Sequence, residues 1–292
     1  MIAEQITIAG IGLLGGSLGL ALRKCGAARR VKGLARREQT VREAKAAGVA
    51  DFATTDPAEA ARGADLVVLC APIGAMPELL RRMLPHLSRN AVVTDVGSAK
   101  RRLAAELEPI CAEAGIAFVG AHPMAGSEQT GVGCARADLF DGALCALTPT
   151  PRTSPQALAQ VEKLWQAVGA RTVRLSPEEH DRIVSRTSHL PHFAAATLAR
   201  HVLGNDRPAR WNSFCGPGFA DTTRIASGSP LMWREIAWAN REFLIQELRA
   251  YAGKLLDAAE KIECGDWETV AGFLETAKAL RDRWLVERKE PP

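Results

Sequence analysis

The chain lacks the features of a membrane protein and of a nucleic-acid-binding protein. No stretch of its 292 residues is apolar over the length that a membrane span requires. Charge of one sign is not in large excess, because 37 Lys and Arg residues stand against 33 Asp and Glu residues. The basic pairs Arg36-Arg37 and Arg101-Arg102 are too short to form a positive stripe for DNA or RNA. We therefore expect a small-molecule ligand that is phosphorylated or carboxylated, and no membrane or nucleic-acid partner.

The seven cysteines lack the spacing of a metal site or of a disulfide framework. Their number is odd, and no two of them form a Cys-x-x-Cys pair. Cys70 lies in an apolar run, which predicts a small buried side chain. This pattern favours reduced thiols and a cytoplasmic protein. The N-terminus enters a strand-like segment directly, so we expect no signal peptide.

A glycine motif with the sequence GIGLLG occupies residues 10–15. An apolar run precedes it and a helix-like segment follows, which is the context of a dinucleotide-binding fingerprint. Gly10 permits the tight turn, Gly12 lets the backbone approach a pyrophosphate, and Gly15 allows close helix–strand packing. The helix N-terminus attracts the phosphate charge. We expect Gly10, Gly12, Leu14 and Gly15 to bind a dinucleotide cofactor.

Short apolar runs alternate with amphipathic stretches through the first part of the chain. The predicted strands are 5–9, 31–35, 66–71, 91–95, 116–120, 144–148 and 171–175. The predicted helices between them are 17–25, 40–47, 76–84, 100–114 and 155–168. Alternating strands and helices predict a parallel sheet that is covered on both faces.

The character of the sequence changes after Ser176, where strand-like runs end. Long helical patterns occupy 177–203, 230–263 and 267–288. The sequence therefore predicts an α/β protein with a Rossmann-like dinucleotide-binding domain at 1–175 and an all-helical domain at 176–292. Because the helical faces carry more apolar surface than a small domain can cover, we expect this second domain to form a homodimer.

The residues after the second predicted strand bear on the choice between NAD and NADP. An acidic residue about 20 positions past the glycines binds the adenosine ribose hydroxyl and selects NAD. The corresponding position here is near Ala35, which is followed by Arg36 and Arg37. Because guanidinium groups match phosphate oxygens, this segment favours NADP. The alternative is that both arginines are solvated turn residues and that NAD is accepted.

Ala71 and Pro72 follow the apolar run that ends in Leu69-Cys70. We expect this strand end at the topological switch point of the sheet, near the nicotinamide end of the cofactor crevice. Pro72 also serves to terminate the strand, and the two roles are compatible.

Histidine is the leading candidate for a catalytic base. A common alternative is a tyrosine with a lysine four residues on, but the single tyrosine, Tyr251, is followed by Lys254 at three residues. His122 directly follows the predicted strand 116–120, and the carboxyl ends of strands are where this fold places reactive groups. A structural role for His122 in the core or as a cap is the alternative.

The other histidines divide into two groups. We expect His86 and His201 at the surface, and His180 in the first turns of a helix, exposed or capping. His189 and His192 flank a proline in the sequence Ser-His-Leu-Pro-His. No third ligand accompanies this pair, so we expect it to line a substrate cleft and predict no metal site.

Arg224 follows a glycine-rich segment that begins at Gly216. Its guanidinium suits two roles, a bidentate clamp on a substrate carboxylate or an ion pair with Asp221. The sequence leaves both open.

Six motifs occur in one order along the chain, namely 10–16, 95–100, 122–126, 188–192, 218–224 and 232–234. In this combination the chain resembles the prephenate/arogenate (cyclohexadienyl) dehydrogenase family of tyrosine biosynthesis. The resemblance implies oxidative decarboxylation of prephenate to 4-hydroxyphenylpyruvate, or of arogenate to tyrosine, with reduction of NAD or NADP. It also implies that His122 accepts the ring hydroxyl proton and that Ser98 orients this hydroxyl and the nicotinamide. Substrate-binding positions implied by the resemblance are Ser188, His189, His192, Arg224 and Trp233.

Two other functions compete with this interpretation. A β-hydroxyacid dehydrogenase shares the architecture but uses a lysine on a helix of the second domain, and residues 185–200 contain no lysine. A non-catalytic NADP-sensing protein would keep the glycines but would not need His122, Ser98 and Arg224. The choice between prephenate and arogenate is open, and Glu128 is a candidate for binding the arogenate ammonium.

Overall fold

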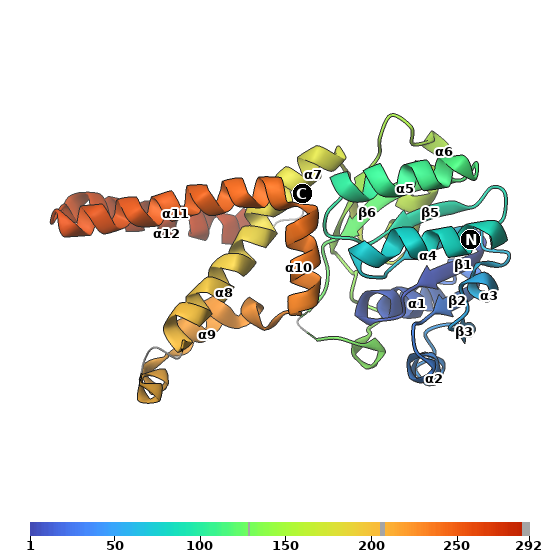
Figure 1. The fold of residues 1–292 in the computed structure, drawn as a ribbon, viewed down its shortest axis with the longest axis horizontal. Coiled ribbons are helices and arrows are strands. Elements are labelled where there is room, and N and C mark those ends of the chain that lie inside the picture. Colours follow the sequence, from blue (N-terminus) through green and yellow to red (C-terminus); the bar gives the residue numbers. More distant parts are fainter. Residues whose placement is uncertain (128, 205–207, 288–292) are drawn as a thin grey trace. The chain divides into compact units, whose positions relative to one another are not determined.

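The computed structural model describes residues 1–127, 129–204 and 208–287. The chain divides into two compact units, Met1–Leu244 and Ile245–Pro292. The first unit contains the whole α/β region and the first helices that follow it (Figure 1).

An eight-stranded sheet forms the centre of the first unit. The strands are β1 (Ala3–Ala9), β2 (Ala28–Leu34), β3 (Phe52–Thr54), β4 (Leu66–Leu69), β5 (Val92–Asp95), β6 (Ala117–Pro123), β7 (Leu144–Thr148) and β8 (Arg171–Arg174). Their order is β3-β2-β1-β4-β5-β6-β7-β8. All neighbours pair in parallel except β6 and β7, which are antiparallel. The predicted parallel sheet is therefore confirmed for β1 to β6, whereas β7 and β8 run in the opposite direction.

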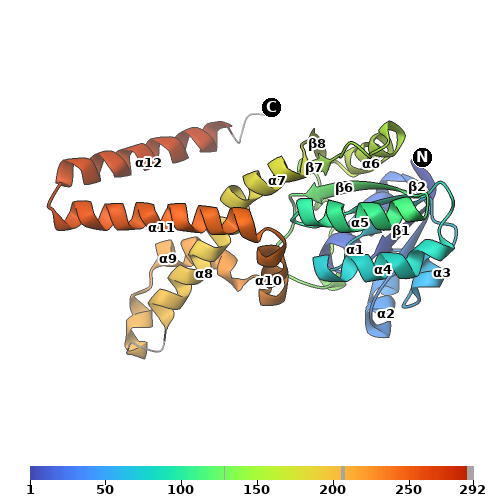
Figure 2. The same cartoon turned by 45° about the horizontal axis from the view of Figure 1, so that its top comes forward.

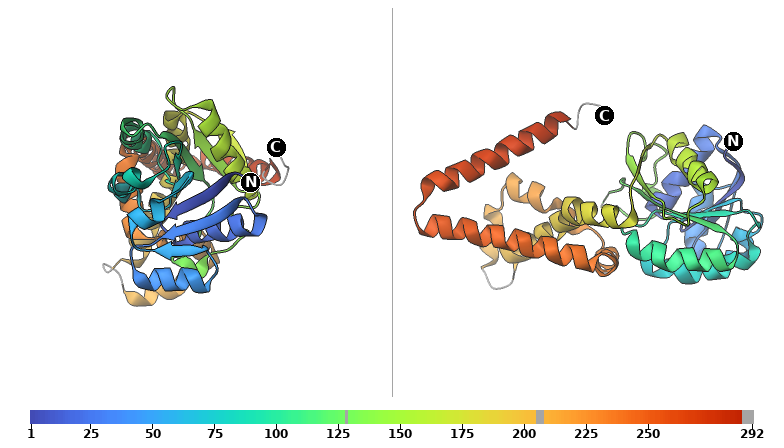
Figure 3. Two further views of the ribbon diagram at one scale, coloured as in Figure 1. Left: turned by 90° about the vertical axis from the view of Figure 1, so that its right-hand side faces the viewer. Right: turned by 90° about the horizontal axis from the view of Figure 1, so that it is seen from above.

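Helices cover both faces of the sheet, which the left view of Figure 3 shows end-on. The helices of this region are α1 (Leu13–Cys25), α2 (Glu38–Ala46), α3 (Pro57–Ala61), α4 (Met76–Met83), α5 (Arg101–Glu113) and α6 (Pro155–Ala167). Buried residues of α1, α2 and α6 share one core cluster, whereas those of α3, α4 and α5 share the other. Because β4 is buried on both faces, it is a continuous apolar run rather than an alternating one.

Two elements escaped sequence-based prediction because they are short. Strand β3 has three residues and α3 has five, too few for a periodic pattern. Strand β6 runs on to Pro123, so His122 lies in the end of the strand rather than after it.

The helical region begins with α7 (Pro177–Val184), the π-helical turn η4 (Ser185–His189) and α8 (Leu190–Leu203), which follow one another along one path (Figure 2). The predicted helix 177–203 is thus correct in extent, with a widened turn in its middle. Single π-turns inside α-helices frequently mark functional sites. This turn carries Ser188 and His189.

The later elements are η5 (Ala209–Phe214), α9 (Pro217–Thr223), η6 (Arg224–Ser227), α10 (Pro230–Ala239), α11 (Arg241–Glu263) and α12 (Trp267–Glu287). The prediction of one helix over 230–263 is wrong, because Asn240 leaves the helical conformation at φ −118° and ψ 29°. The break lets α10 pack separately against the α/β region. There Glu235 accepts a hydrogen bond from the Gly74 amide at 3.2 Å, and the Arg102 guanidinium lies 3.1 Å from the centre of the Trp238 ring.

The second unit holds the rest of α11 and all of α12, joined by a short turn (Figure 3, right). None of the α12 residues that the structure describes is buried. The large apolar side chains that are exposed on these helices include Leu255, Leu256, Trp267, Phe273, Leu274, Leu280 and Trp284. No helix within the described ranges has the length and apolarity to cross a membrane.

Candidate active site

The glycine turn between β1 and α1 has the geometry that a dinucleotide fingerprint requires. Gly10 has φ +117°, and a Cβ there would lie 2.6 Å from the Cys70 carbonyl oxygen. A Cβ on Gly15 would lie 2.0 Å from the Gly10 oxygen, so helix and strand can approach only with glycine at this position. Gly12 faces open space and caps α1 without a side-chain hydrogen bond. The first amides of α1 are thus available to an anion.

The carboxyl ends of β1 and β4 form the switch point of the sheet. Strand β1 pairs with both β2 and β4, and the helices after β1 and β4 cover opposite faces. Ala71 and Pro72 directly follow β4 at this point. Arg36 and Arg37 follow β2, are exposed, and Arg37 is the N-cap residue of α2.

A cavity of about 440 Å³ lies beside the first residue of α1. The loop after β6 forms most of its wall. Its lining residues are Leu13, Met124, Ala125, Gly126, Ser127, Gln129, Cys134, Arg136, Leu139 and Ala143. The open glycine turn, the uncapped helix and this cavity fit a bound dinucleotide.

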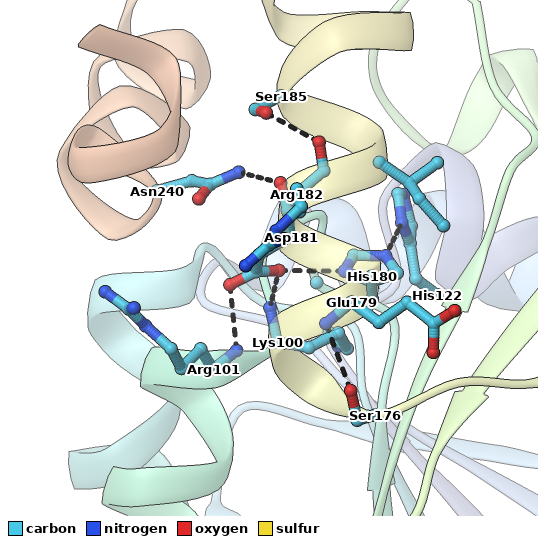
Figure 4. A network of polar contacts seen from close by, with 12 residues as sticks. Lys100, Arg101, His122, Ser176, Glu179, His180, Asp181, Arg182, Ser185 and Asn240 are labelled. Atoms are coloured by element: carbon cyan, nitrogen blue, oxygen red, sulfur yellow. Dashed lines mark hydrogen bonds and ion pairs between the residues drawn. The ribbon is translucent and has the colours of Figure 1, made fainter. Parts of the chain in front are cut away.

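His122 sits at the end of β6 and contacts a second histidine (Figure 4). Its Nδ1 lies 2.8 Å from Nε2 of His180, and Nδ1 of His180 lies 2.8 Å from Oδ1 of Asp181. The expectation that His180 is exposed or capping is wrong, because only 1% of it is accessible. Helix α7, which carries it, packs against α5 and β7. Its neighbour Asp181, which completes an Asp–His–His chain, was also missed.

Asp181 has a second function at the start of α5. Its carboxylate accepts hydrogen bonds from the amides of Lys100 at 2.7 Å and Arg101 at 2.9 Å. These bonds satisfy amide donors that a helix N-terminus leaves without partners. The carboxylate is therefore held from two sides while it bonds His180.

A buried ion pair between Lys100 and Asp95 links the ends of β5 and β6 next to His122. The Lys100 ammonium donates to the Asp95 carboxylate and, at 2.7 Å, to the Ala121 carbonyl. Asp95 in turn accepts from the Gly97 amide at 2.8 Å and from the Ala121 amide at 3.2 Å. Both charged groups lie in the motif at 95–100 together with Ser98, and nothing in the sequence marks them as an ion pair.

The surroundings of His122 and His180 favour the neutral form of both rings. Burial, followed by the neighbouring His180 and the Lys100 charge, holds the pKa of His122 well below the usual range of histidine. Burial also lowers the pKa of His180, against the opposing effect of the Asp181 hydrogen bond. A neutral imidazole is what a general base must be before it accepts a proton.

The predicted substrate-binding residues lie around the π-turn and the start of α10. His189 and His192 are buried, and Ser188 is half-buried. The ring of His192 stacks on Trp233 with centroids 3.5 Å apart and planes 10° apart. Gly228 makes room for this stack, since a Cβ there would lie 2.8 Å from Nε1 of Trp233.

Ser98 and Arg224 occupy different surroundings. Ser98 is half-buried after β5, and its backbone is close enough to His189 to influence the pKa of that ring. Arg224 is exposed and begins η6, which packs against α8, the helix of His192. Glu128 lies outside the described residues. Within the described ranges, no three His, Cys, Asp or Glu side chains are grouped as a metal site requires.

Comparisons with known proteins agree with this geometry. The model of the prephenate dehydrogenase nucleotide-binding domain matches residues 18–174, and that of the prephenate dehydrogenase dimerization domain matches residues 176–276. A prephenate dehydrogenase of Bacillus subtilis is 33% identical over 98% of this chain and 77% of its own length. A cyclohexadienyl dehydrogenase of Zymomonas mobilis is also 33% identical, over 94% of both chains.

Solved structures give the same picture. Prephenate dehydrogenase from A. aeolicus, in complex with hydroxyphenyl propionate and NAD+, has a TM-score of 0.90 at 32% identity and covers 96% of this chain and 98% of its own. Synechocystis arogenate dehydrogenase has a TM-score of 0.81 at 30% identity, over 96% and 99% of the two chains. A 3-hydroxyisobutyrate dehydrogenase of Mycobacterium tuberculosis, at 14% identity and a TM-score of 0.53 over 82% and 93% of the chains, shares the fold alone.

Proposed function

Because the chain belongs to the prephenate dehydrogenase family, we propose that it catalyses the oxidative decarboxylation of prephenate to 4-hydroxyphenylpyruvate, or of arogenate to tyrosine. It is an oxidoreductase that uses a nicotinamide dinucleotide and acts on a small molecule. The observation that carries the proposal is the buried Asp181–His180–His122 chain at the end of β6, beside the switch point of the sheet.

The hydrogen bonds among Asp181, His180 and His122 indicate which nitrogen of His122 carries its proton. The Asp181 carboxylate can only accept, so Nδ1 of His180 donates to it. Nε2 of the neutral His180 then accepts, and Nδ1 of His122 is the donor. His122 is left with a lone pair on Nε2, the nitrogen that faces away from His180. This is the protonation state that a general base requires.

In the proposed reaction, Nε2 of His122 takes the proton of the ring hydroxyl. A bound nicotinamide supplies the acceptor for the hydride that leaves the hydroxyl-bearing carbon. Loss of carbon dioxide makes the ring aromatic, so the residues mainly have to deprotonate, orient and hold the substrate. The charge that arises on His122 is stabilised through His180 by the Asp181 carboxylate.

The remaining site residues are proposed to orient the substrate. Ser98 holds the ring hydroxyl next to His122. The wall formed by the half-buried Ser188 and Trp233 and the buried His189 and His192 supports contacts to the substrate side chain. Arg224 is proposed to clamp a substrate carboxylate, since a dianionic ligand needs a fixed cation.

The preference for NADP over NAD is a proposal that rests on Arg36 and Arg37. Both are exposed at the end of β2, where the adenosine ribose of a dinucleotide lies, and the first carboxylate after them is Glu38. Gly10, Gly12, Leu14 and Gly15 are proposed to bind the pyrophosphate, and Ala71 and Pro72 to face the nicotinamide end.

We also propose that residues 1–175 act as the dinucleotide-binding domain and that 176–292 act as a substrate-binding and dimerisation domain. The two family models, which meet between residues 174 and 176, support this division. The exposed apolar side chains on α11 and α12 support a homodimer. The seven free cysteines support a reducing, cytoplasmic location.

The test is the increase in absorbance of reduced nicotinamide when the purified protein is mixed with prephenate or arogenate and with NADP or NAD. We expect turnover that depends on substrate and is lost in the His122→Asn variant. Parallel kinetics with the two substrates assign the preference. A folded protein that reduces neither cofactor with either substrate would reject the proposal.

A further inference from the structure

Asn240 connects the two groups of histidines in the site. It lies at the break between α10 and α11 and is only 3% exposed. Its carboxamide nitrogen lies 2.8 Å from the backbone oxygen of Asp181, as Figure 4 shows, and 3.2 Å from Nδ1 of His189. One side chain therefore contacts both the residue that orients His180 and the ring of His189.

The chemistry of these contacts determines the tautomer of His189. The Asp181 backbone oxygen can only accept a hydrogen bond, so the Asn240 atom that faces it must be the NH₂ group. The second hydrogen of this NH₂ group serves the contact with Nδ1 of His189, which must then accept. A neutral His189 consequently carries its proton on Nε2.

Nε2 of His189 lacks a well-formed hydrogen bond to any residue that the structure describes. His189 is 1% exposed, and its Nε2 is buried without a hydrogen bond of regular geometry in the described part of the chain, although the Ser98 backbone makes a hydrogen-bonding contact with the ring that raises the pKa of His189. Leaving a buried donor unpaired costs about 1–3 kcal/mol, so such groups point to a missing ligand or water. The Trp233 ring stands edge-on at 6.0 Å between centroids, and His192 and the Ser98 backbone are also neighbours.

His189 is neutral under ordinary conditions. Burial lowers the pKa of His189 to about 4, which outweighs the opposing effects of the Asp181 charge and of a hydrogen-bonding contact with the Ser98 backbone. His180 and His192 act in the same direction as burial. The ring is thus a hydrogen-bond donor without a charge.

We propose that Asn240 is a positioning residue, which holds His189 in the Nε2–H form so that His189 donates a hydrogen bond to an oxygen of the bound substrate. The inference rests on the proposed function for the identity of that substrate. It gives the two histidines opposite roles. His122 presents a lone pair, set by Asp181 through His180, whereas His189 presents a proton, set by Asn240.

Nuclear magnetic resonance of protein labelled with ¹⁵N-histidine tests the tautomer directly in the wild type. His189→Gln assigns the signal by its disappearance. We expect the two nitrogens of His189 to show a protonated Nε2 and an unprotonated Nδ1. Prephenate added together with reduced cofactor, which cannot accept a hydride, should change the chemical shifts of Nε2 and of the proton that it carries. The inference is overturned if Nδ1 carries the proton. It is also overturned if saturation with prephenate leaves the chemical shift of Nε2 unchanged.

Two substitutions extend the test to kinetics. Asn240→Asp places an acceptor against Nδ1 and should move the proton of His189 to that nitrogen, whereas Asn240→Leu removes the contact at similar volume. We expect KM for the substrate to rise by about 10-fold in Asn240→Asp, the scale of one hydrogen bond, with a smaller change in kcat. Asn90→Asp is the matched control, because Asn90 is exposed in a turn of the α/β region.

The outcomes separate this inference from the proposed function. If the wild type turns over prephenate but Asn240→Asp keeps the wild-type KM and tautomer, the positioning role of Asn240 is wrong. If the wild type neither turns over nor binds prephenate, the proposed function fails and the substrate contact falls with it, whereas the tautomer of His189 is still decided by the spectrum.

Discussion

Nδ1 of His122 lies 2.8 Å from Nε2 of His180, and both rings are buried. Because the other nitrogen of His180 bonds Asp181, the pair has one consistent proton arrangement, which leaves Nε2 of His122 free to act as a base. Asp181 is fixed independently by the first amides of α5. The base is thus oriented by a side chain that also caps a helix of the cofactor domain.

His180→Phe should lower kcat by about 10- to 100-fold while KM changes little. The variant keeps the ring volume but removes the acceptor that stabilises charge on His122, a loss of about 1.5–3 kcal/mol for a hydrogen bond to a charged group. Steady-state kinetics measure this, with His86→Phe as the control for an exposed histidine. A kcat equal to that of the wild type would show that His180 only fills space.

His122→Asn should lower kcat by about 10²–10⁴ and leave cofactor affinity nearly intact, as expected for the loss of one acid–base group. In the wild type, kcat should fall on the acidic side as His122 becomes protonated. Since burial holds the pKa of His122 well below its usual range, this fall should begin below a pH of about 6.5. An acidic limb that persists unshifted in the variant would refute the role of His122.

Replacing Arg36 and Arg37 together by Ala should weaken the binding of NADP by about 1.5–3 kcal/mol, the scale of charge-assisted hydrogen bonds to a phosphate. The specificity constant with NAD should change little, because NAD has no 2′-phosphate. The measurement is kcat/KM for each cofactor in the wild type and in the double variant. Equal use of both cofactors by the wild type would contradict the proposed preference.

Arg224→Ala should raise KM for the substrate by about 10²-fold, with a smaller effect on kcat, because a carboxylate clamp holds ground state and transition state alike. Arg224→Lys should restore binding only in part, since lysine lacks the planar fork. The competing hypothesis is a structural role with Asp221, which predicts a lower melting temperature at unchanged KM. Both quantities should be measured on one preparation.

Light scattering at micromolar concentration should give the mass of a dimer. The exposed apolar side chains of the second unit include Leu256 and Leu280, which are 67% and 60% accessible in one chain. Replacing both by Glu should shift the equilibrium towards the monomer, because a charge in an apolar interface costs several kcal/mol to desolvate. A monomeric mass for the wild type over the whole concentration range would argue against the homodimer.

The sequence by itself determined the parts of this protein that depend on local order. The glycine motif predicted its own turn, since Gly10 has a φ of +117° and Gly15 must make room for the Gly10 oxygen five residues before it. The alternation of apolar strands, such as β4 and β5, with amphipathic helices predicted the sheet. The end of this alternation near Leu175 predicted the change to an all-helical region. His122 was found because a strand end is recognisable from local pattern.

Only the tertiary structure decided what His122 touches. His180 and Asp181 lie 58 and 59 positions from His122 in the sequence, and their pattern at the start of α7 is that of an exposed helix turn. They become site residues because α7 packs against α5 and β7. The hydrophobic pattern of a helix does not specify which elements it packs against. The break at Asn240 has the same origin. A helical pattern spans it, and only the packed fold shows that the Asn240 side chain contacts the Asp181 backbone and His189, where burial strengthens both hydrogen bonds.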